Sequence, residues 1–170
     1  MNRRFFLLSP LFLTVAACAA PAPPRLGDDG KPLARLYRID SADTAAIQFR
    51  MLDGVNALRQ ASGGAPLQLN AELNAAAATH SRDMSVQNRP WHFGSDGSSP
   101  IDRVRRVGYT GTLLGENISE TFETELETLA AWANEASTRK VMTDPRAQLL
   151  GFAWFQEENG KIWWTLITGT

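Results

Sequence analysis

The strongest constraint on the fold lies near the C-terminus, where two apolar runs rich in aromatic residues flank a turn signal. The runs are residues 150–155 and 161–167, and Asn159-Gly160 stands immediately before the second. Asn-Gly is typical of a tight β-hairpin because both residues tolerate the positive φ angles that such a turn needs. The sequence therefore predicts an antiparallel pair of strands whose tryptophans bury one face in the core.

Further upstream, apolar residues recur with the period of a helix. Ile47, Met51, Val55 and Leu58 fall on one helical face, and Ser41 is the expected N-cap. This pattern predicts a first amphipathic helix at the start of the folded part of the chain.

A second helix is predicted between the cap residue Asn70 and a break at residues 88–90. Its apolar stripe is Leu73, Ala76, Ala77, His80 and Met84. His80 has two interpretations. Its ring could pack at the edge of the core, with its nitrogens bonded to a backbone or side-chain partner, or it could be a direct ligand.

The middle of the chain predicts two more helices and a strand. Residues 100–107 form a short helical segment, and Glu116 opens a strand. A long helix is expected over residues 124–136, on which Trp132 and Glu135 are neighbours because they are three residues apart. Helices followed by a terminal hairpin predict an α+β fold, in which helices cover a small, mostly antiparallel sheet.

The N-terminus has the pattern of an export signal. Arg3 and Arg4 precede an apolar segment, and small residues lead to Cys18, the single cysteine of the chain. The pattern closely resembles a bacterial lipobox and predicts that Cys18 is lipid-modified and anchors the protein to a membrane. The other interpretations of Cys18 are a leftover of a simple cleaved signal and a buried small side chain.

We therefore expect three parts: a signal peptide over residues 1–17, the lipidated cysteine and a flexible linker over residues 18–40, and one domain over residues 41–170. One cysteine allows no intrachain disulfide, so packing alone must stabilise this exported domain.

The charge of the chain argues against one class of partner. The 17 Lys and Arg stand against 18 Asp and Glu, and the signal would remove two of the arginines. No excess of positive charge attracts a polyanion, so we expect no nucleic-acid partner. Arg103, Arg105 and Arg106 cluster on the short helix, where a solvated face is the simpler interpretation and contact with anionic lipid or glycan is the other.

Loop residues held by a rigid scaffold often carry function, and His92 lies in such a place, between Trp91 and a turn rich in glycine. The landmarks of the chain, in order, are Val55–Arg59, Pro66-Leu67, His80–Met84, His92 with Gly94 and Asp96-Gly97, Gly108-Tyr109, Gly115–Ile118, Trp132 with Glu135, and Trp163–Thr165. Their order and spacing resemble the CAP superfamily (cysteine-rich secretory proteins, antigen 5 and plant pathogenesis-related proteins) in its bacterial SCP-like form. The resemblance covers residues 44–169 and implies an α-β-α sandwich.

The resemblance also implies a cleft that two histidines and two glutamates line in many members. His92 matches the first histidine, Glu116 the first glutamate, and Glu135, three residues after a tryptophan, the second. Trp163 stands where many eukaryotic members carry the second histidine, and the histidine of many bacterial members is replaced as well. We therefore take these four residues as cleft candidates and expect no metal and no cofactor.

Three roles are open for His92, Glu116 and Glu135. They could form a hydrogen-bonded network that fixes loops to a helix, recognise a ligand, or act as acid/base groups in catalysis. Ser95 and Ser98 are near in sequence, but neither sits in a nucleophile-elbow pattern.

We predict a membrane-anchored envelope lipoprotein whose CAP-like domain binds a lipid, glycan or peptide in the cleft without turning it over. The alternative is an envelope hydrolase that uses His92 with Glu116 or Glu135. Ala19 is not the aspartate associated with inner-membrane retention in enteric bacteria, so the outer membrane is expected where a cell has two membranes.

Overall fold

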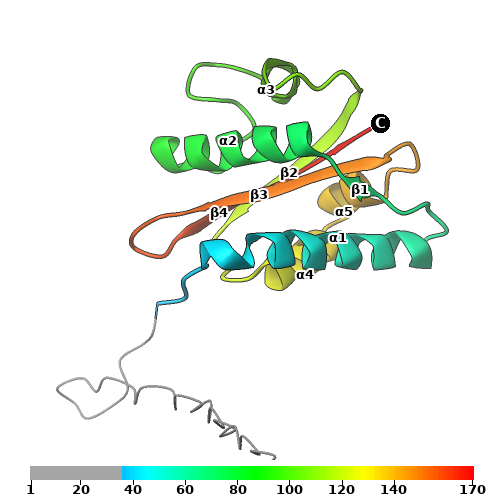
Figure 1. The fold of residues 1–170 in the computed structure, drawn as a ribbon, viewed down its shortest axis with the longest axis horizontal. Coiled ribbons are helices and arrows are strands. Elements are labelled where there is room, and N and C mark those ends of the chain that lie inside the picture. The colour runs from blue at the N-terminus through cyan, green and yellow to red at the C-terminus, as the bar shows by residue number, and fades with distance from the viewer. Residues whose placement is uncertain (1–35) are drawn as a thin grey trace, which may run out of the picture. The chain divides into compact units, whose positions relative to one another are not determined.

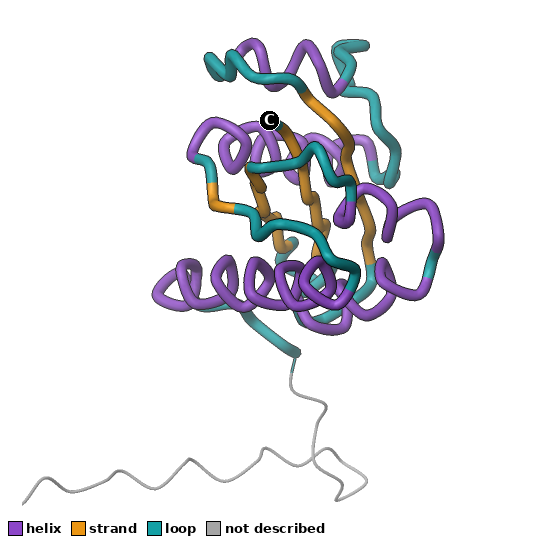
Figure 2. Tube along the Cα trace, turned by 90° about the vertical axis from the view of Figure 1, so that its right-hand side faces the viewer, coloured by secondary structure: helices purple, strands orange, loops and turns teal. Residues whose placement is uncertain are grey.

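A four-stranded sheet lies between two layers of helices in the computed structural model, which describes residues 36–170 (Figure 1). The helices are α1 (Thr44–Ala61), α2 (Ala71–Gln87), α3 (Pro100–Arg106), α4 (Glu125–Asn134) and α5 (Ala136–Thr143), with a 3-10 turn at Ser41–Asp43. Helices α2 and α3 cover one face of the sheet, and α1, α4 and α5 cover the other (Figures 1 and 2). The predicted α+β class and the α-β-α sandwich are confirmed.

The sheet has the order β1-β3-β4-β2. Its strands are β1 (Gln68–Leu69), β2 (Leu113–Glu120), β3 (Leu149–Gln156) and β4 (Ile162–Gly169). Strands β3 and β4 form the predicted hairpin, with Trp154 opposite Trp164 and Gly160 at a φ of 96° in the turn. Strand β2 is antiparallel to β4, and β1 is parallel to β3 over two residues. Most of β3 is therefore an edge strand.

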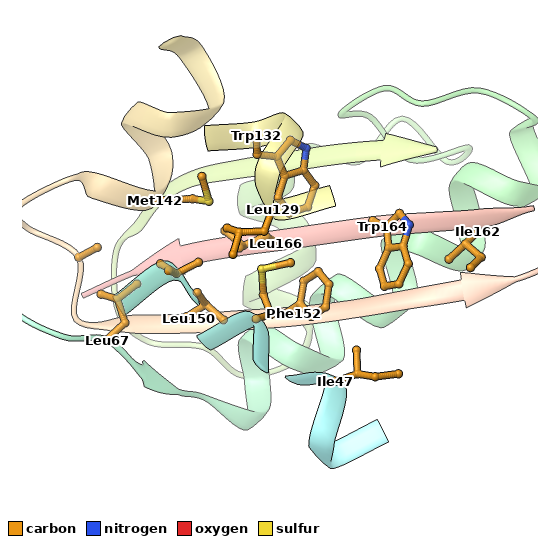
Figure 3. Packing of buried hydrophobic residues seen from close by; sticks show 13 residues of the cluster. Ile47, Leu67, Leu129, Trp132, Met142, Leu150, Phe152, Ile162, Trp164 and Leu166 are labelled. Atoms are coloured by element: carbon orange, nitrogen blue, oxygen red, sulfur yellow. The ribbon is translucent and has the colours of Figure 1, made fainter. Parts of the chain in front are cut away.

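The larger core fills the space between the sheet and α1, α4 and α5 (Figure 3). The rings of Phe152 and Trp164 stack with centroids 5.6 Å apart, and Trp132 meets Phe152 edge-on at 6.4 Å. Each such buried side chain stabilises the fold by about 1.5–3 kcal/mol. The predicted burial of the hairpin tryptophans is confirmed for Trp164, and Trp154 packs against the same cluster.

A smaller core lies under α2, which packs closely on β3. A Cβ atom on Gly151 would overlap the backbone of Leu73, so this glycine permits the close approach of helix and strand. Asn70 caps α2 as predicted, because its side chain accepts the Leu73 N–H at 2.8 Å.

One prediction at α1 is wrong. Asp40, not Ser41, caps the first helical turn, since its carboxylate accepts a backbone N–H at 2.9 Å. Leu58 is half-buried and packs against the larger core, as predicted, and the next residue, Arg59, is buried as well. Arg59 is 1% exposed, and its guanidinium donates to the carbonyls of Ala65, Met142, Asp144 and Ala147. These hydrogen bonds make burial of the charge possible.

The helix predicted over residues 124–136 is two helices. Glu135 adopts an extended conformation (φ −93°, ψ 128°) between α4 and α5. Its side chain accepts the Ser137 N–H at 3.4 Å, and the Thr138 hydroxyl donates to the Trp132 carbonyl at 2.7 Å. Such side-chain bonds replace backbone bonds at helix ends. Trp132 and Glu135 consequently do not share one helical surface.

Residues 36–40, which we assigned to the linker, contact the β3–β4 hairpin. The Gln156 amide accepts the Ile39 N–H at 3.0 Å and donates to the Tyr37 carbonyl at 2.8 Å. Arg38 adds donor bonds to two carbonyls of the hairpin turn. The segment just before α1 is therefore held against the end of the sheet.

The predicted signal peptide, Cys18 and the linker as far as residue 35 lie outside the described residues. Within residues 36–170, no helix combines the length and the apolar character that crossing a membrane requires.

Candidate functional site

Glu116 lies in the middle of β2 and points to the face of the sheet that α2 and α3 cover. Its neighbours point the other way: a Cβ on Gly115 would meet Val141, and Asn117 donates to the Thr138 carbonyl at 2.9 Å. Alternation along the strand turns Glu116 toward α3. The side chain is only 3% exposed. A carboxylate buried to this degree needs a partner of opposite charge.

Arg103 of α3 is that partner. Its Nη2 donates to both carboxylate oxygens of Glu116, at 2.7 and 3.0 Å, and Arg103 is itself buried. Its Nη1 donates to the carbonyls of His92 at 2.8 Å and Ser98 at 3.2 Å. One guanidinium therefore joins α3 to β2 and shapes the loop that carries His92. Our prediction of a solvated face is wrong for Arg103, whereas the other two arginines of the cluster are exposed.

His92 bonds to the same carboxylate from the solvent side. Its Nδ1 lies 2.8 Å from Oε1 of Glu116, and its side chain is 52% exposed. Because an ionised carboxylate only accepts hydrogen bonds, Nδ1 carries a proton, and in the neutral ring Nε2 keeps an accepting lone pair. The buried pair thus holds the imidazole in one tautomer and leaves Nε2 for a ligand.

His80 of α2 lies behind the carboxylate. Its ring is fully buried, with Nε2 3.7 Å from Oε1 of Glu116. Burial agrees with our prediction, but neither ring nitrogen reaches hydrogen-bond geometry with a partner in the described part of the chain. Burial lowers the pKa of His80, although attraction to Glu116 opposes that effect. His80 is therefore a neutral ring near neutral pH.

The environment keeps Glu116 ionised. Burial by itself raises the pKa of Glu116, but the hydrogen bond from His92 and the charge and hydrogen bonds of Arg103 act in the opposite direction and lower it overall. An ionised carboxylate that two donors already engage serves to orient His92 rather than to transfer a proton itself.

The structure places Glu135 apart from this cluster. Glu135 is exposed at the α4–α5 break, where its side chain accepts from the backbone and the hydroxyl of Ser137. Across residues 36–170 no hydrogen bond or ion pair joins it to His92 or Glu116. The second glutamate that the resemblance implied is thus not in direct contact with the first.

Trp163, the fourth candidate, is fully buried on the α2 side of β4. Its indole N–H donates to Glu157 at 2.6 Å, and the Lys161 ammonium lies 3.9 Å from the ring centroid. These contacts fix the end of the hairpin. They give Trp163 a structural role.

A cavity of about 350 Å³ opens beside His92 and Glu116. It is lined by His92, Ser99, Pro100, Ile101, Leu113, Leu114, Gly115 and Glu116. Ile101 is 48% exposed at its rim. The volume falls in the range of small-ligand sites, which combine apolar walls with a few oriented polar groups.

No hydroxyl near this cavity is arranged as a nucleophile. Ser99 caps α3 and donates to Asp102 at 2.7 Å, and Ser95 donates to Asp83 at 2.6 Å. The donor set does not fit a divalent cation either, because the positive charge of Arg103 occupies both oxygens of Glu116. Within residues 36–170 no group of three or more His, Cys, Asp or Glu side chains could hold a metal ion.

Arg103 is the member of the cluster that the sequence did not reveal, and His80 was predicted at the edge of the core but not beside Glu116. The available signal for Arg103 was its place beside the apolar Val104 on a helix that starts with a Ser99–Asp102 capping box. That signal shows which face of α3 is buried, but it does not show that the arginine points inward.

The α-β-α sandwich, in which a loop histidine is hydrogen-bonded to a strand glutamate, defines a class of protein. Comparison of the chain with known proteins identifies the family. The family described as CAP: Cysteine-rich secretory protein family matches residues 52–167. The chain belongs to this family. The uncharacterized protein YkwD of Bacillus subtilis (strain 168) is 30% identical over 122 residues, which are 72% of this chain and 47% of YkwD. The matched part thus spans about half of that relative.

Solved structures share the fold. An outer surface protein from Borrelia burgdorferi superposes with a TM-score of 0.69 at 16% identity, over 78% of this chain and 96% of that one. An extracellular protein containing an SCP domain from Bacillus anthracis str. Ames gives a TM-score of 0.68 at 20% identity, over 78% of this chain and 45% of that one. At these identities the likeness establishes the architecture alone.

Proposed function

We propose that the protein is an exported envelope lipoprotein, anchored through Cys18, whose CAP domain binds a ligand at His92. The observation that carries the proposal is an exposed imidazole held in one tautomer by the buried Glu116–Arg103 pair, beside a cavity with apolar walls. Glu116 and Arg103 cancel each other's charge beneath the ring. The site therefore favours an uncharged group that donates a hydrogen bond and has an apolar part, as a lipid, glycan or peptide offers.

The export part of the proposal rests on the lipobox at Cys18 and on the similar proteins. One of these is described as an outer surface protein and another as an extracellular protein. A lipid anchor would keep the binding domain close to the envelope components that supply its ligand, and the outer membrane is its expected site in a cell with two membranes.

The test is mass spectrometry of compounds retained by the full-length protein after incubation with envelope extract. Wild type and Lys140→Ala should retain a compound that His92→Ala does not. Lys140 is exposed on α5, in the opposite helical layer, and controls for nonspecific loss. Equal retention by His92→Ala would contradict the proposal.

One observation favours a second candidate, an envelope hydrolase. Nε2 of His92 is an acceptor on a ring that a carboxylate orients, which is the arrangement of a general base that activates water. The same incubation distinguishes the two. A released product that only wild type and Lys140→Ala form indicates hydrolysis, whereas a retained, unchanged compound indicates binding.

A further inference from the structure

The free edge of β3 carries backbone groups that β4 does not use. Strand β1 pairs with β3 only at Leu149 and Leu150, although β3 continues to Gln156. The Phe152 N–H donates to the Asn74 side chain at 2.7 Å, and the Phe152 carbonyl accepts from Gln48 at 3.0 Å. The backbone groups of Phe152 therefore point away from β4.

The same alternation applies two residues further on. In an antiparallel pair, every second residue directs its N–H and C=O away from the partner strand, so Trp154 faces the same edge as Phe152. No hydrogen bond found among residues 36–170 uses the backbone N–H or C=O of Trp154. Such groups are the template for a further strand.

This edge opens into a cavity of about 530 Å³. It is lined by Ile39, Asp40, Ser41, Thr44, Gln48, Asn74, Ala75, Ala78, Ala153 and Trp154. Helices α1 and α2 cover opposite faces of the sheet (Figure 1), and residues of both helices line this cavity, so it forms a groove along the sheet edge. On the α2 wall, Ala75 and Ala78 are exposed and small, which leaves room for a main chain.

The groove already holds groups that imitate a peptide. The side chains of Asn74 and Gln48 are amides, and at Phe152 they take the positions of the C=O and N–H of a neighbouring strand. Asp40 is the charged residue of the lining and is exposed at one end. The edge is thus complementary to backbone amides, and its charge favours a basic side chain.

We propose that this groove binds an extended peptide of a partner protein, with small side chains and one basic residue, which pairs with Trp154 in line with β1. Main-chain hydrogen bonds to a sheet edge give such binding its affinity, and pockets for alternate side chains give its specificity. The site is separate from His92 and does not depend on the function proposed above.

Hydrogen exchange at the Trp154 amide tests the proposal on the full-length protein. The probe is a short acetylated and amidated peptide of alanine and valine with one lysine, added up to ~5 mM, a range that detects weak complexes. Exchange of the Trp154 amide should slow about tenfold, because the amide becomes a donor to the added strand. The same peptide with N-methyl groups on alternate residues should give no protection, since it cannot form the ladder.

A variant and a matched control complete the test. Ala78→Phe fills the groove from an exposed position of α2 and should abolish the protection. Val86→Phe, at a position 75% exposed on the same helix but absent from the lining, should retain it. No protection in wild type, equal protection by the N-methylated peptide, or protection that depends on protein concentration without peptide overturns the proposal. The last result would identify a second copy of the chain as the occupant.

Discussion

Replacement of Arg103 by methionine tests whether the buried ion pair holds the His92 site together. Arg103 donates twice to Glu116 and once each to the carbonyls of His92 and Ser98. Methionine fills similar space but donates nothing, so Glu116 keeps only the bond from His92. Removing one partner of a buried pair costs about 3–5 kcal/mol, against a total stability of about 5–15 kcal/mol for a typical domain. We expect Arg103→Met to lose a large share of the free energy of unfolding.

The assay is urea unfolding near neutral pH, followed by tryptophan fluorescence. Arg105→Met is the matched control on the exposed side of α3, and should change the free energy of unfolding by less than about 0.5 kcal/mol. The double variant Arg103→Met/Glu116→Gln removes the stranded charge as well. It should be more stable than Arg103→Met by about 1–3 kcal/mol.

The pH dependence gives a second, independent check. The pKa of Glu116 is lowered in the native protein, so its ionised form contributes stability above the unfolded pKa, and this is lost as pH falls through the folded pKa. Without Arg103, we expect burial, the largest single effect on Glu116, to outweigh the hydrogen bond from His92 and to raise the folded pKa above the unfolded value. The free-energy cost of burying an ionised Glu116 without Arg103 is then absent below the unfolded pKa, and it grows as pH rises through the folded pKa. Arg103→Met should therefore lose less stability at about pH 4 than at about pH 7. Equal losses at the two values, or a loss below about 1 kcal/mol at the higher one, would refute the reasoning.

Four further changes have defined outcomes in the same unfolding assay. Gly151→Ala should cost about 1–3 kcal/mol, because the added Cβ would overlap the Leu73 backbone; an unchanged midpoint would contradict the close packing of α2. Arg59→Met should cost about 3 kcal/mol or more, since it leaves two buried and two partly buried carbonyls without their donor. Glu135→Ala should cost about 1 kcal/mol as a lost helix cap and leave ligand retention unchanged; lost retention would instead assign Glu135 to the site. Burial lowers the pKa of His80, so stability should fall as pH drops below about 6.5, and His80→Leu should flatten that dependence.

Helices and the hairpin were predictable because their signals are local. The cap at Asn70, the apolar period of α2 and Asn159-Gly160 each act within a few residues, and the structure agrees with all three. The break at Glu135 was missed although its cause is also local. The Glu135 side chain accepts a backbone N–H and the Thr138 hydroxyl donates to a backbone carbonyl at the break. The apolar period of the sequence continues across these residues and therefore does not indicate that the helix ends.

Half of the candidate site was predictable. His92 and Glu116 were identified from their motifs, and the structure joins them by a hydrogen bond. Trp163 was assigned to the cleft through the place of a missing histidine, but its neighbours bury it at the end of the hairpin. A match to a family motif predicts where a residue lies on the backbone of the fold. The exposure of its side chain depends on which other side chains surround it.

The sequence by itself determined α1, α2, α3, the hairpin, the family and the two residues at the centre of the site, because periodicity, caps and spacing are local properties of the chain. Only the tertiary structure decided that Arg103 and His80 surround Glu116 and that Arg59 is buried. The physical reason is that an arginine on a helix looks the same in sequence whether water or a buried partner solvates it. Glu116 is 13 residues from Arg103 and 24 from His92, and only the packing of α3 against β2 brings the three side chains together.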